Sequence, residues 1–198
     1  SAASDVYKRQ RQEDMDSGKK TINHVEIRKI LPVQDGYRMP GEYEPHRGCI
    51  LIWPERPGSW RNGAREAKKA FADVIRAIAK SEEVYLAASG KTFSEAEKLA
   101  QRLQTDEALY PIRVFTAETD DAWARDVGPT FVTDGQEVRG INWEFNAWGG
   151  TEDGLYASWE KDNRFAPFFC EKEGYTWYDA RPFVLEGGSV HSLSLIHI

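Results

Sequence analysis

The chain has 198 residues and a formal net charge of −6, with 40% hydrophobic and 29% charged residues. This length allows one sizeable domain with a core, and the composition is typical of a globular protein rather than a disordered one. No cluster of lysines and arginines predicts a nucleic-acid surface, whereas an acidic chain tolerates cationic ligands. No apolar run reaches about 18 residues, so no segment is expected to span a membrane.

The two cysteines, Cys49 and Cys170, lie in unrelated contexts. They form neither a disulfide framework nor a Cys-x-x-Cys metal motif, and neither lies in a turn typical of a nucleophile. We expect both to be inert packing residues in a reducing compartment. The start lacks the apolar core of a signal peptide, so a cytoplasmic location is expected.

The two ends of the chain differ from the rest. Residues 1–28 are polar and show no sustained period, which predicts a mobile arm. The last residues do not continue the strand before them, and both ends resemble translated sequencing-adapter read-through. We therefore expect roughly 1–14 and 192–198 to be non-native, with Met15 as an alternative start, and 29–191 to form one incomplete domain.

Short β-rich runs bounded by turn residues predict strands along the chain. Two further runs, PTFVT and EVRGINW, flank Asp134-Gly135, which is a strong hairpin signal. The single strands are predicted at 49–53, 83–89, 112–116 and 182–188.

Helices are predicted between these strands. Residues 65–80 have a helical period, Ser94 to Glu97 reads as a capping box for a helix that runs to about Leu103, and 158–170 is partly helical but interrupted by Pro167. The apolar face predicted for the first helix comprises Ala67, Ala70, Phe71, Val74, Ile75 and Ile78.

Strands separated by helices of this length predict an α/β layer structure, to which the hairpin adds antiparallel pairing. The order strand, loop, helix, strand occurs twice, once from Cys49 and again from Glu137. We interpret this as a repeat of ββαβ-type modules.

The stretch DDAWARDVGP, residues 120–129, is the first candidate site. Four acids between residues 118 and 126, less Arg125, give a local charge of −3. A divalent metal ion binds several oxygen ligands, but Trp123 is a poor neighbour for a hydrated ion. A planar guanidinium fits carboxylates beside an aromatic ring better. Turn formation by aspartate accounts for Asp120 and Asp121 but less well for Asp126.

Glu186 is the second candidate, because it follows an apolar run and precedes two glycines. A carboxylate there is costly to bury unless a cation meets it, and glycine permits close approach of a ligand. An ordinary salt bridge is the alternative for Glu186. His191 and His46 are each expected to be structural hydrogen-bonding residues.

Together these motifs resemble a known family. The blocks DGYRMPGEYEPH, LIWPERPGSWR, DDAWARDVGP, INWEFNAWGG and FVLEGGSVH, in this order from about Val33 to His191, resemble the agmatine deiminases, which are grouped with the bacterial-type peptidylarginine deiminases. The resemblance implies a five-bladed α/β propeller, the pentein fold, built of ββαβ modules and truncated here at about half. It also implies hydrolysis of agmatine to N-carbamoylputrescine and ammonia in putrescine biosynthesis, with no organic cofactor and no metal.

The resemblance also assigns residues to roles. It makes Asp126 and Glu186 the catalytic carboxylates that bind the guanidinium, and it packs Trp123 against the stem of the substrate. Weaker pocket candidates are Asn146, Trp148 and His191. The nucleophilic cysteine and the acid/base histidine of the family lie in segments that these 198 residues do not contain, so the chain alone is expected to be inactive.

Several alternatives stay open at this point. One is a deiminase of peptidyl or free arginine, and another is a non-catalytic module that binds guanidinium compounds or polyamines. A glycoside hydrolase fragment would also use tryptophans with an acid pair. The expected partner is a small guanidinium compound, neither nucleic acid nor membrane is expected, and homo-oligomerisation of the full-length enzyme is left open.

Overall fold

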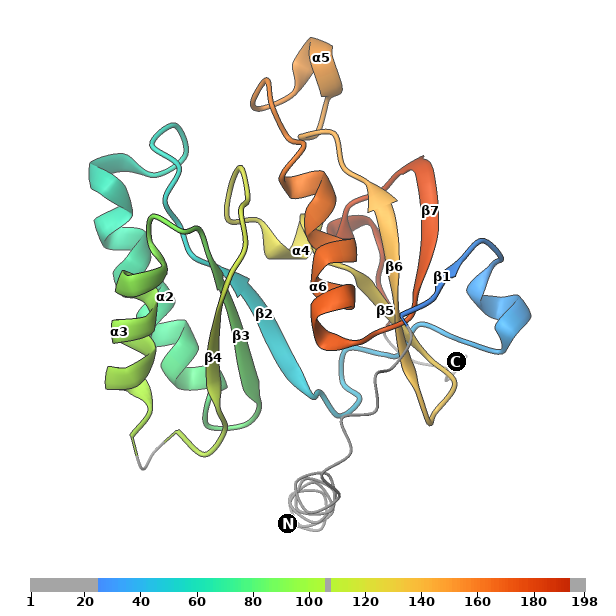
Figure 1. Cartoon of the computed structure of the whole chain (residues 1–198), viewed down its shortest axis with the longest axis horizontal. Helices are drawn as coiled ribbons and strands as arrows, with labels where there is room; N and C mark the ends of the chain where they lie inside the picture. Colours follow the sequence, from blue (N-terminus) through green and yellow to red (C-terminus); the bar gives the residue numbers. More distant parts are fainter. Residues whose placement is uncertain (1–24, 106–107, 193–198) are drawn as a thin grey trace, which may run out of the picture.

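A computed structural model describes residues 25–105 and 108–192 (Figure 1). The predicted non-native segment 1–14, the alternative start at Met15 and nearly all of the predicted tail lie outside these ranges. Ile27 and Arg28, which the sequence placed in the arm, form a short strand, β1 (Ile27–Arg28). Within the described ranges, no helix combines the length and the apolar character needed to cross a bilayer.

The first sheet contains three parallel strands in the order β2-β3-β4, with bounds β2 (Gly48–Ile52), β3 (Glu83–Ala88) and β4 (Ile112–Thr116). The connections are α2 (Arg65–Ile78) and α3 (Phe93–Leu103), which lie together on one face of this sheet (Figure 1). The three strands and the two helices confirm the predictions for this half of the chain.

The second sheet has the order β1-β7-β6-β5. Its strands β5 (Thr130–Thr133) and β6 (Val138–Glu144) form the antiparallel hairpin predicted around Asp134-Gly135. The chain then passes through α6 (Phe165–Glu173) and returns as β7 (Trp177–Val184), which pairs in parallel with both β6 and β1. This β5-β6-α6-β7 unit is a ββαβ module, as the sequence predicted for the second repeat.

Short helical turns complete the described chain. Their bounds are η1 (Pro32–Asp35), η2 (Arg61–Ala64), α4 (Ala124–Val127), α5 (Gly150–Asp153), η3 (Asp162–Arg164) and η4 (Gly187–Ser189).

Both faces of β3 are buried, because each is covered by a different layer. Val84 and Leu86 belong to the core beneath α2 and α3, whereas Tyr85 and Ala87 face the core that contains Phe169 of α6. This alternation follows from the two-residue period of a strand. The core that contains Tyr85, Ala87 and Phe169 joins the two sheets, and α6 lies between the sheets (Figure 1).

The close packing of α6 on the second sheet depends on Gly140 of β6. A Cβ atom at this position would lie 2.4 Å from Sγ of Cys170, which is fully buried in α6. Burial raises the pKa of the Cys170 thiol to about 12. The structure thus supports the expected packing role of this cysteine.

Some local predictions were wrong. In α2, Ala70 and Val74 are exposed, because the buried stripe turns toward Phe71 and Ile75. The predicted capping box is wrong too: α3 begins at Phe93, one residue before the predicted start at Ser94.

Two predictions near the C-terminal end were also wrong. Pro167 does not interrupt a helix, because it is the third residue of α6, where its missing N–H would have no intrahelical partner. The last strand begins at Trp177 and ends at Val184, so Glu186 lies in the loop beyond it.

Candidate functional site

The predicted site residues gather in the loops that follow the carboxyl ends of the parallel strands. The segment 117–129 follows β4, the segment 145–149 follows β6, and Glu186 follows β7. A shift in the β6–β7 register between Asn142 and Glu144 lies just before two of these loops. Such irregularities re-aim the chain at the end of a strand.

Asp121 is the structural centre of the 117–129 loop. Its carboxylate is buried and accepts hydrogen bonds from the indole N–H groups of Trp60 and Trp123, both at 2.9 Å, and from the hydroxyl of Ser59. The backbone N–H of Ala122 donates a further bond at 2.8 Å. A carboxylate with this many donors has little capacity left for a ligand.

Asp162, which the sequence analysis did not single out, holds the same loop through hydrogen bonds to its backbone. It is fully buried at the start of η3 and accepts hydrogen bonds from the backbone N–H of Asp120, at 2.7 Å, and from the hydroxyl of Tyr156. Burial is the main cause that raises its pKa to about 6. Asp162 therefore joins the loop after β4 to the helical segment before β7.

The other two acids of the loop also have structural partners. Glu118 accepts a hydrogen bond from the backbone N–H of Gly90 at 3.0 Å, and Asp120 accepts one from the backbone N–H of Lys161 at 3.0 Å. The turn-forming interpretation of Asp120 and Asp121 agrees with these contacts.

Asp126 differs from these three acids. It lies half-buried in α4, and burial, the largest influence, raises the pKa of its carboxyl group. A hydrogen bond from the Trp148 side chain opposes this effect, whereas the negative charge of Glu186 adds to it. The negative charge of Glu186 thus disfavours ionisation of Asp126, and a cation bound beside both groups would offset this effect.

The loop that carries Glu186 is held directly against α4. A Cβ atom on Gly187 would lie only 2.2 Å from the backbone oxygen of Arg125, so glycine is required for this approach. The guanidinium of Arg125 pairs with Glu42 at 2.7 Å and donates to the backbone oxygen of Val190 at 3.5 Å. Arg125 thus fastens the loop after β7 beside Asp126.

Trp123 belongs to a group of three indoles beside these carboxyl groups. It stacks on Trp60 with a centroid distance of 5.6 Å and meets Trp148 edge-on at 5.9 Å. Trp123 is half-buried and Trp148 is 37% exposed, so the group is not sealed in the interior. Aromatic surfaces that remain accessible beside carboxylates can stack on a flat cation or on its methylene stem.

Asn146 and Trp148, the weaker candidates, lie in a strained turn after β6. Ala147 and Trp148 both have positive φ angles, 55° and 63°. Asn146 Oδ1 is buried and accepts no hydrogen bond within the described part of the chain. Strain of this kind and an unpaired acceptor are commonly found where a ligand binds.

His191 is exposed, and its Nε2 atom lies 2.9 Å from the backbone oxygen of Gly188. It therefore stabilises the turn after Glu186, in line with the structural role expected from the sequence.

The cavity that lies against Asp126 is too small for an organic ligand. This cavity has a volume of about 10 Å³. That is room for about one water molecule, whereas pockets for small molecules span about 300–1,000 Å³.

The arrangement of these strands and helices is also found in solved structures of agmatine deiminases. An agmatine deiminase of Enterococcus faecalis, whose structure was solved catalysing its reaction, superposes with a TM-score of 0.76 at 41% identity, over 85% of this chain and 44% of that one. An agmatine deiminase of C. jejuni resembles it in fold alone, with a TM-score of 0.58 at 19% identity, over 77% of this chain and 42% of that one. The expected α/β class and partial propeller are thereby confirmed.

The sequence comparison is more specific. Residues 38–193 match the Porphyromonas-type peptidyl-arginine deiminase family, and the chain belongs to that family. The agmatine deiminase of Pseudomonas aeruginosa is 48% identical over 161 residues, which cover 81% of this chain and 42% of that protein. The chain therefore spans less than half the length of the curated relatives it matches.

Proposed function

We propose that this chain is the guanidinium-binding part of an agmatine deiminase. The observation that supports this most strongly is the packing of the loop that carries Glu186 on α4, which carries Asp126, beside three indoles at one strand edge. Two carboxylates can accept the paired N–H groups of a planar guanidinium, and the indoles can pack on its apolar stem. A positive ligand also offsets the repulsion between the two acids.

The proposed reaction converts agmatine and water into N-carbamoylputrescine and ammonia. By its resemblance to the family, a cysteine attacks the guanidinium carbon, ammonia leaves, and water then releases the product, with a histidine moving the protons. Asp126 and Glu186 would hold the guanidinium nitrogens and stabilise the charge during attack. The cysteine and the histidine belong to segments outside these 198 residues, so we expect no turnover by this chain alone.

Binding can be tested without turnover. Calorimetry with agmatine should show binding to the 198-residue chain, and putrescine, which lacks the guanidinium group, should bind much more weakly. The isosteric variants Asp126→Asn and Glu186→Gln should each weaken agmatine binding, whereas Glu118→Gln in the same loop should not. Equal binding of agmatine by all of these proteins would refute the assignment.

Catalysis requires a second experiment. The 198-residue chain should form no ureido product from agmatine, and a full-length protein built around it, with the missing segments supplied from a relative, should form it. Turnover by the short chain at an ordinary enzymatic rate would contradict the proposed division of the active site.

The family description favours a second candidate, deimination of peptidyl arginine. Agmatine lacks the α-carboxylate and the amide groups of an arginine residue, so the two substrates can be compared directly in the full-length protein. Preference for an arginyl peptide would favour the second candidate. We also propose a cytoplasmic location, which fits the two free cysteines, and leave self-association of the full-length enzyme to be measured.

A further inference from the structure

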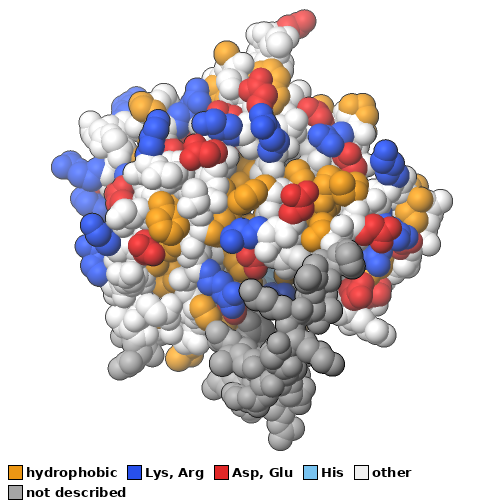
Figure 2. Space-filling view, viewed as in Figure 1, with side chains coloured by type: hydrophobic (Ala, Val, Ile, Leu, Met, Phe, Trp, Pro, Cys, Tyr) orange, Lys and Arg blue, Asp and Glu red, His pale blue; other side chains and the backbone are white. Residues whose placement is uncertain are grey.

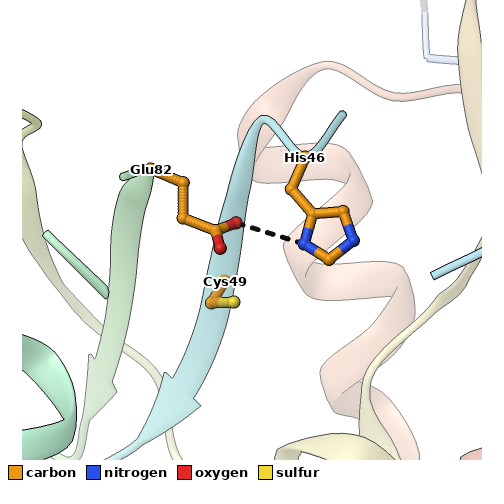
Figure 3. A group of neighbouring side chains, drawn as sticks. All are labelled: His46, Cys49 and Glu82. Atoms are coloured by element: carbon orange, nitrogen blue, oxygen red, sulfur yellow. Dashed lines mark ion pairs between the residues drawn. The ribbon is translucent and has the colours of Figure 1, made fainter. Parts of the chain in front are cut away.

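Three potential metal ligands meet at the end of the first sheet that lies away from the candidate site. His46 lies two residues before β2, Cys49 is the second residue of β2, and Glu82 immediately precedes β3 (Figure 3). The strands β2 and β3 are neighbours, with Gly48 opposite Glu83. The sheet register therefore brings these side chains together at the amino ends of the strands.

The spacing of the donor atoms suits a small tetrahedral metal ion. His46 Nδ1 lies 3.4 Å from Glu82 Oε2, and the donor atoms of all three residues lie within 4.8 Å of one another. Ligands of a tetrahedral zinc ion are separated by about 3.3–3.8 Å, given metal–ligand bonds of about 2.0–2.3 Å. The histidine and the glutamate already have this separation, and a small movement of the Cys49 side chain would complete it.

Hydrogen bonding determines which nitrogen of His46 faces the cluster. The Nε2 atom lies 2.8 Å from the backbone oxygen of Glu42, and a carbonyl oxygen can only accept a hydrogen bond. Nε2 therefore carries the proton of the neutral ring, and the lone pair of Nδ1 faces Glu82. Metal-binding histidines are commonly oriented in this way by a carbonyl group on the other nitrogen.

The glutamate oxygen that faces this lone pair lacks a donor. Glu82 Oε2 is buried and accepts no hydrogen bond from the described residues. Two acceptors that face each other at 3.4 Å repel unless a positive charge lies between them. A proton on the imidazole or a metal ion would satisfy both.

The presence of a thiol favours the metal over the proton. The Cys49 side chain points into the same space (Figure 3), and a thiolate with a carboxylate would neutralise a divalent ion. Zinc binds cysteine as the thiolate, so metal binding here would release the thiol proton to solvent.

We propose that His46, Cys49 and Glu82 bind one zinc ion, with the fourth position open to water. The set of nitrogen, sulfur and oxygen donors matches zinc rather than magnesium or calcium, which prefer oxygen ligands alone. The ion would tie the start of β2 to the loop before β3. It would have no part in deimination, and it departs from the expectation that the chain binds no metal and that Cys49 is inert.

Zinc titration of the metal-free 198-residue chain, in competition with a chromophoric chelator, tests this proposal. We expect one zinc ion per chain. Cobalt in place of zinc should give thiolate-to-cobalt charge-transfer absorption and the strong visible bands of four-coordination. Each of the variants His46→Asn, Cys49→Ser and Glu82→Gln should weaken zinc binding at least about tenfold.

Matched controls distinguish this cluster from binding elsewhere. His191→Asn and Cys170→Ala change the same residue types at other positions and should leave zinc binding unchanged. Zinc should also raise the melting temperature of the unmodified chain but not that of Glu82→Gln, which keeps the shape of the side chain and decides the question if Cys49→Ser fails to fold. Undiminished zinc binding by the three ligand variants, or a cobalt complex without a sulfur signature, would overturn the proposal.

Discussion

The two ends of the acidic loop between β4 and β5 differ in what their carboxyl groups contact. At the first end, Asp121 receives hydrogen bonds from two indoles, a hydroxyl and a backbone amide. At the second end, Asp126 is half-buried, and burial together with the negative charge of Glu186 raises the pKa of its carboxyl group. The charge is the same, but only the first end has its hydrogen-bonding capacity filled.

This difference separates the acid that builds the loop from the acid that is available to a ligand. A saturated buried carboxylate stabilises the fold, because its removal leaves several donors without a partner. An unsaturated carboxylate near another negative charge destabilises the empty protein, and a cation reverses that effect. Substitutions at the two ends should therefore affect different properties.

The largest effect is expected for Asp126→Ala in a full-length enzyme built around this chain. Loss of a carboxylate that holds the reacting guanidinium should lower kcat/KM by about 10³-fold, with little change in melting temperature. Steady-state kinetics and thermal unfolding measure the two quantities. Glu118→Ala, in the same loop, serves as the control, and near-normal activity of Asp126→Ala would contradict the role.

Asp121→Ala should have the opposite profile. Removing this carboxylate leaves the indole N–H groups of Trp60 and Trp123 without an acceptor, so we expect a loss of about 2–4 kcal/mol in the free energy of unfolding. Denaturant unfolding of the 198-residue chain measures it. A change below about 0.5 kcal/mol, the range typical of surface substitutions, would show that the hydrogen-bond network does not support the loop.

Gly187→Ala tests how closely the Glu186 loop must approach α4. The added Cβ would meet the Arg125 backbone oxygen at 2.2 Å, so the loop must move, and we expect agmatine binding to weaken by about 1–3 kcal/mol. Gly188→Ala is the matched control, because its Cβ would have no atom within 4 Å. Equal affinities for the two variants would mean that the approach is unnecessary.

Asp162 should make stability depend on pH. Its pKa is raised from 3.8 to about 6 in the folded chain, so the folded state holds this proton more tightly than the unfolded state does. Its contribution to stability therefore falls as pH rises from about 4 to about 6, by on the order of 2 kcal/mol. A plot of the free energy of unfolding against pH should fall more steeply across this range for the unmodified chain than for Asp162→Asn. Equal slopes for the two proteins would refute the expectation.

The smallest effect is expected for Trp148→Phe, which keeps a ring but removes the N–H that stabilises the Asp126 carboxylate. The pKa of Asp126 should rise further. In the full-length enzyme the acidic limb of kcat/KM should then move to higher pH, by less than about one unit. Trp159→Phe is a suitable control, and an acidic limb that stays in place would argue against this hydrogen bond.

Much of this architecture could be predicted from the sequence. The strand runs, the Asp134-Gly135 hairpin and the second ββαβ module are local patterns, and the structure contains them. Asp126 and Glu186 were singled out because turn chemistry did not explain the first and burial would penalise the second. Their proximity, by contrast, depends on how the loop after β7 packs on α4, which no local pattern records.

Residues that act through long-range contacts were missed for the same reason. Asp162 lies in an ordinary polar stretch, yet its carboxylate supports a loop about 40 residues earlier in the chain. His46 and Cys49 are three residues apart, but their partner Glu82 arrives only through the β2–β3 pairing. Ala70 and Val74 were predicted to lie on the buried face of α2 but are exposed, so the helical period locates that face only approximately.

The pairing of β1 with β7 has a consequence for the order in which the chain can fold. Every strand of the first sheet is available once residue 116 has been synthesised, and its strands pair with partners close in sequence. Ile27 of β1, however, pairs with Trp177 and must wait for the far end of the second module. Because distant pairings form late and N-terminal segments emerge first, the first sheet can assemble on the ribosome while β1 still lacks its neighbour.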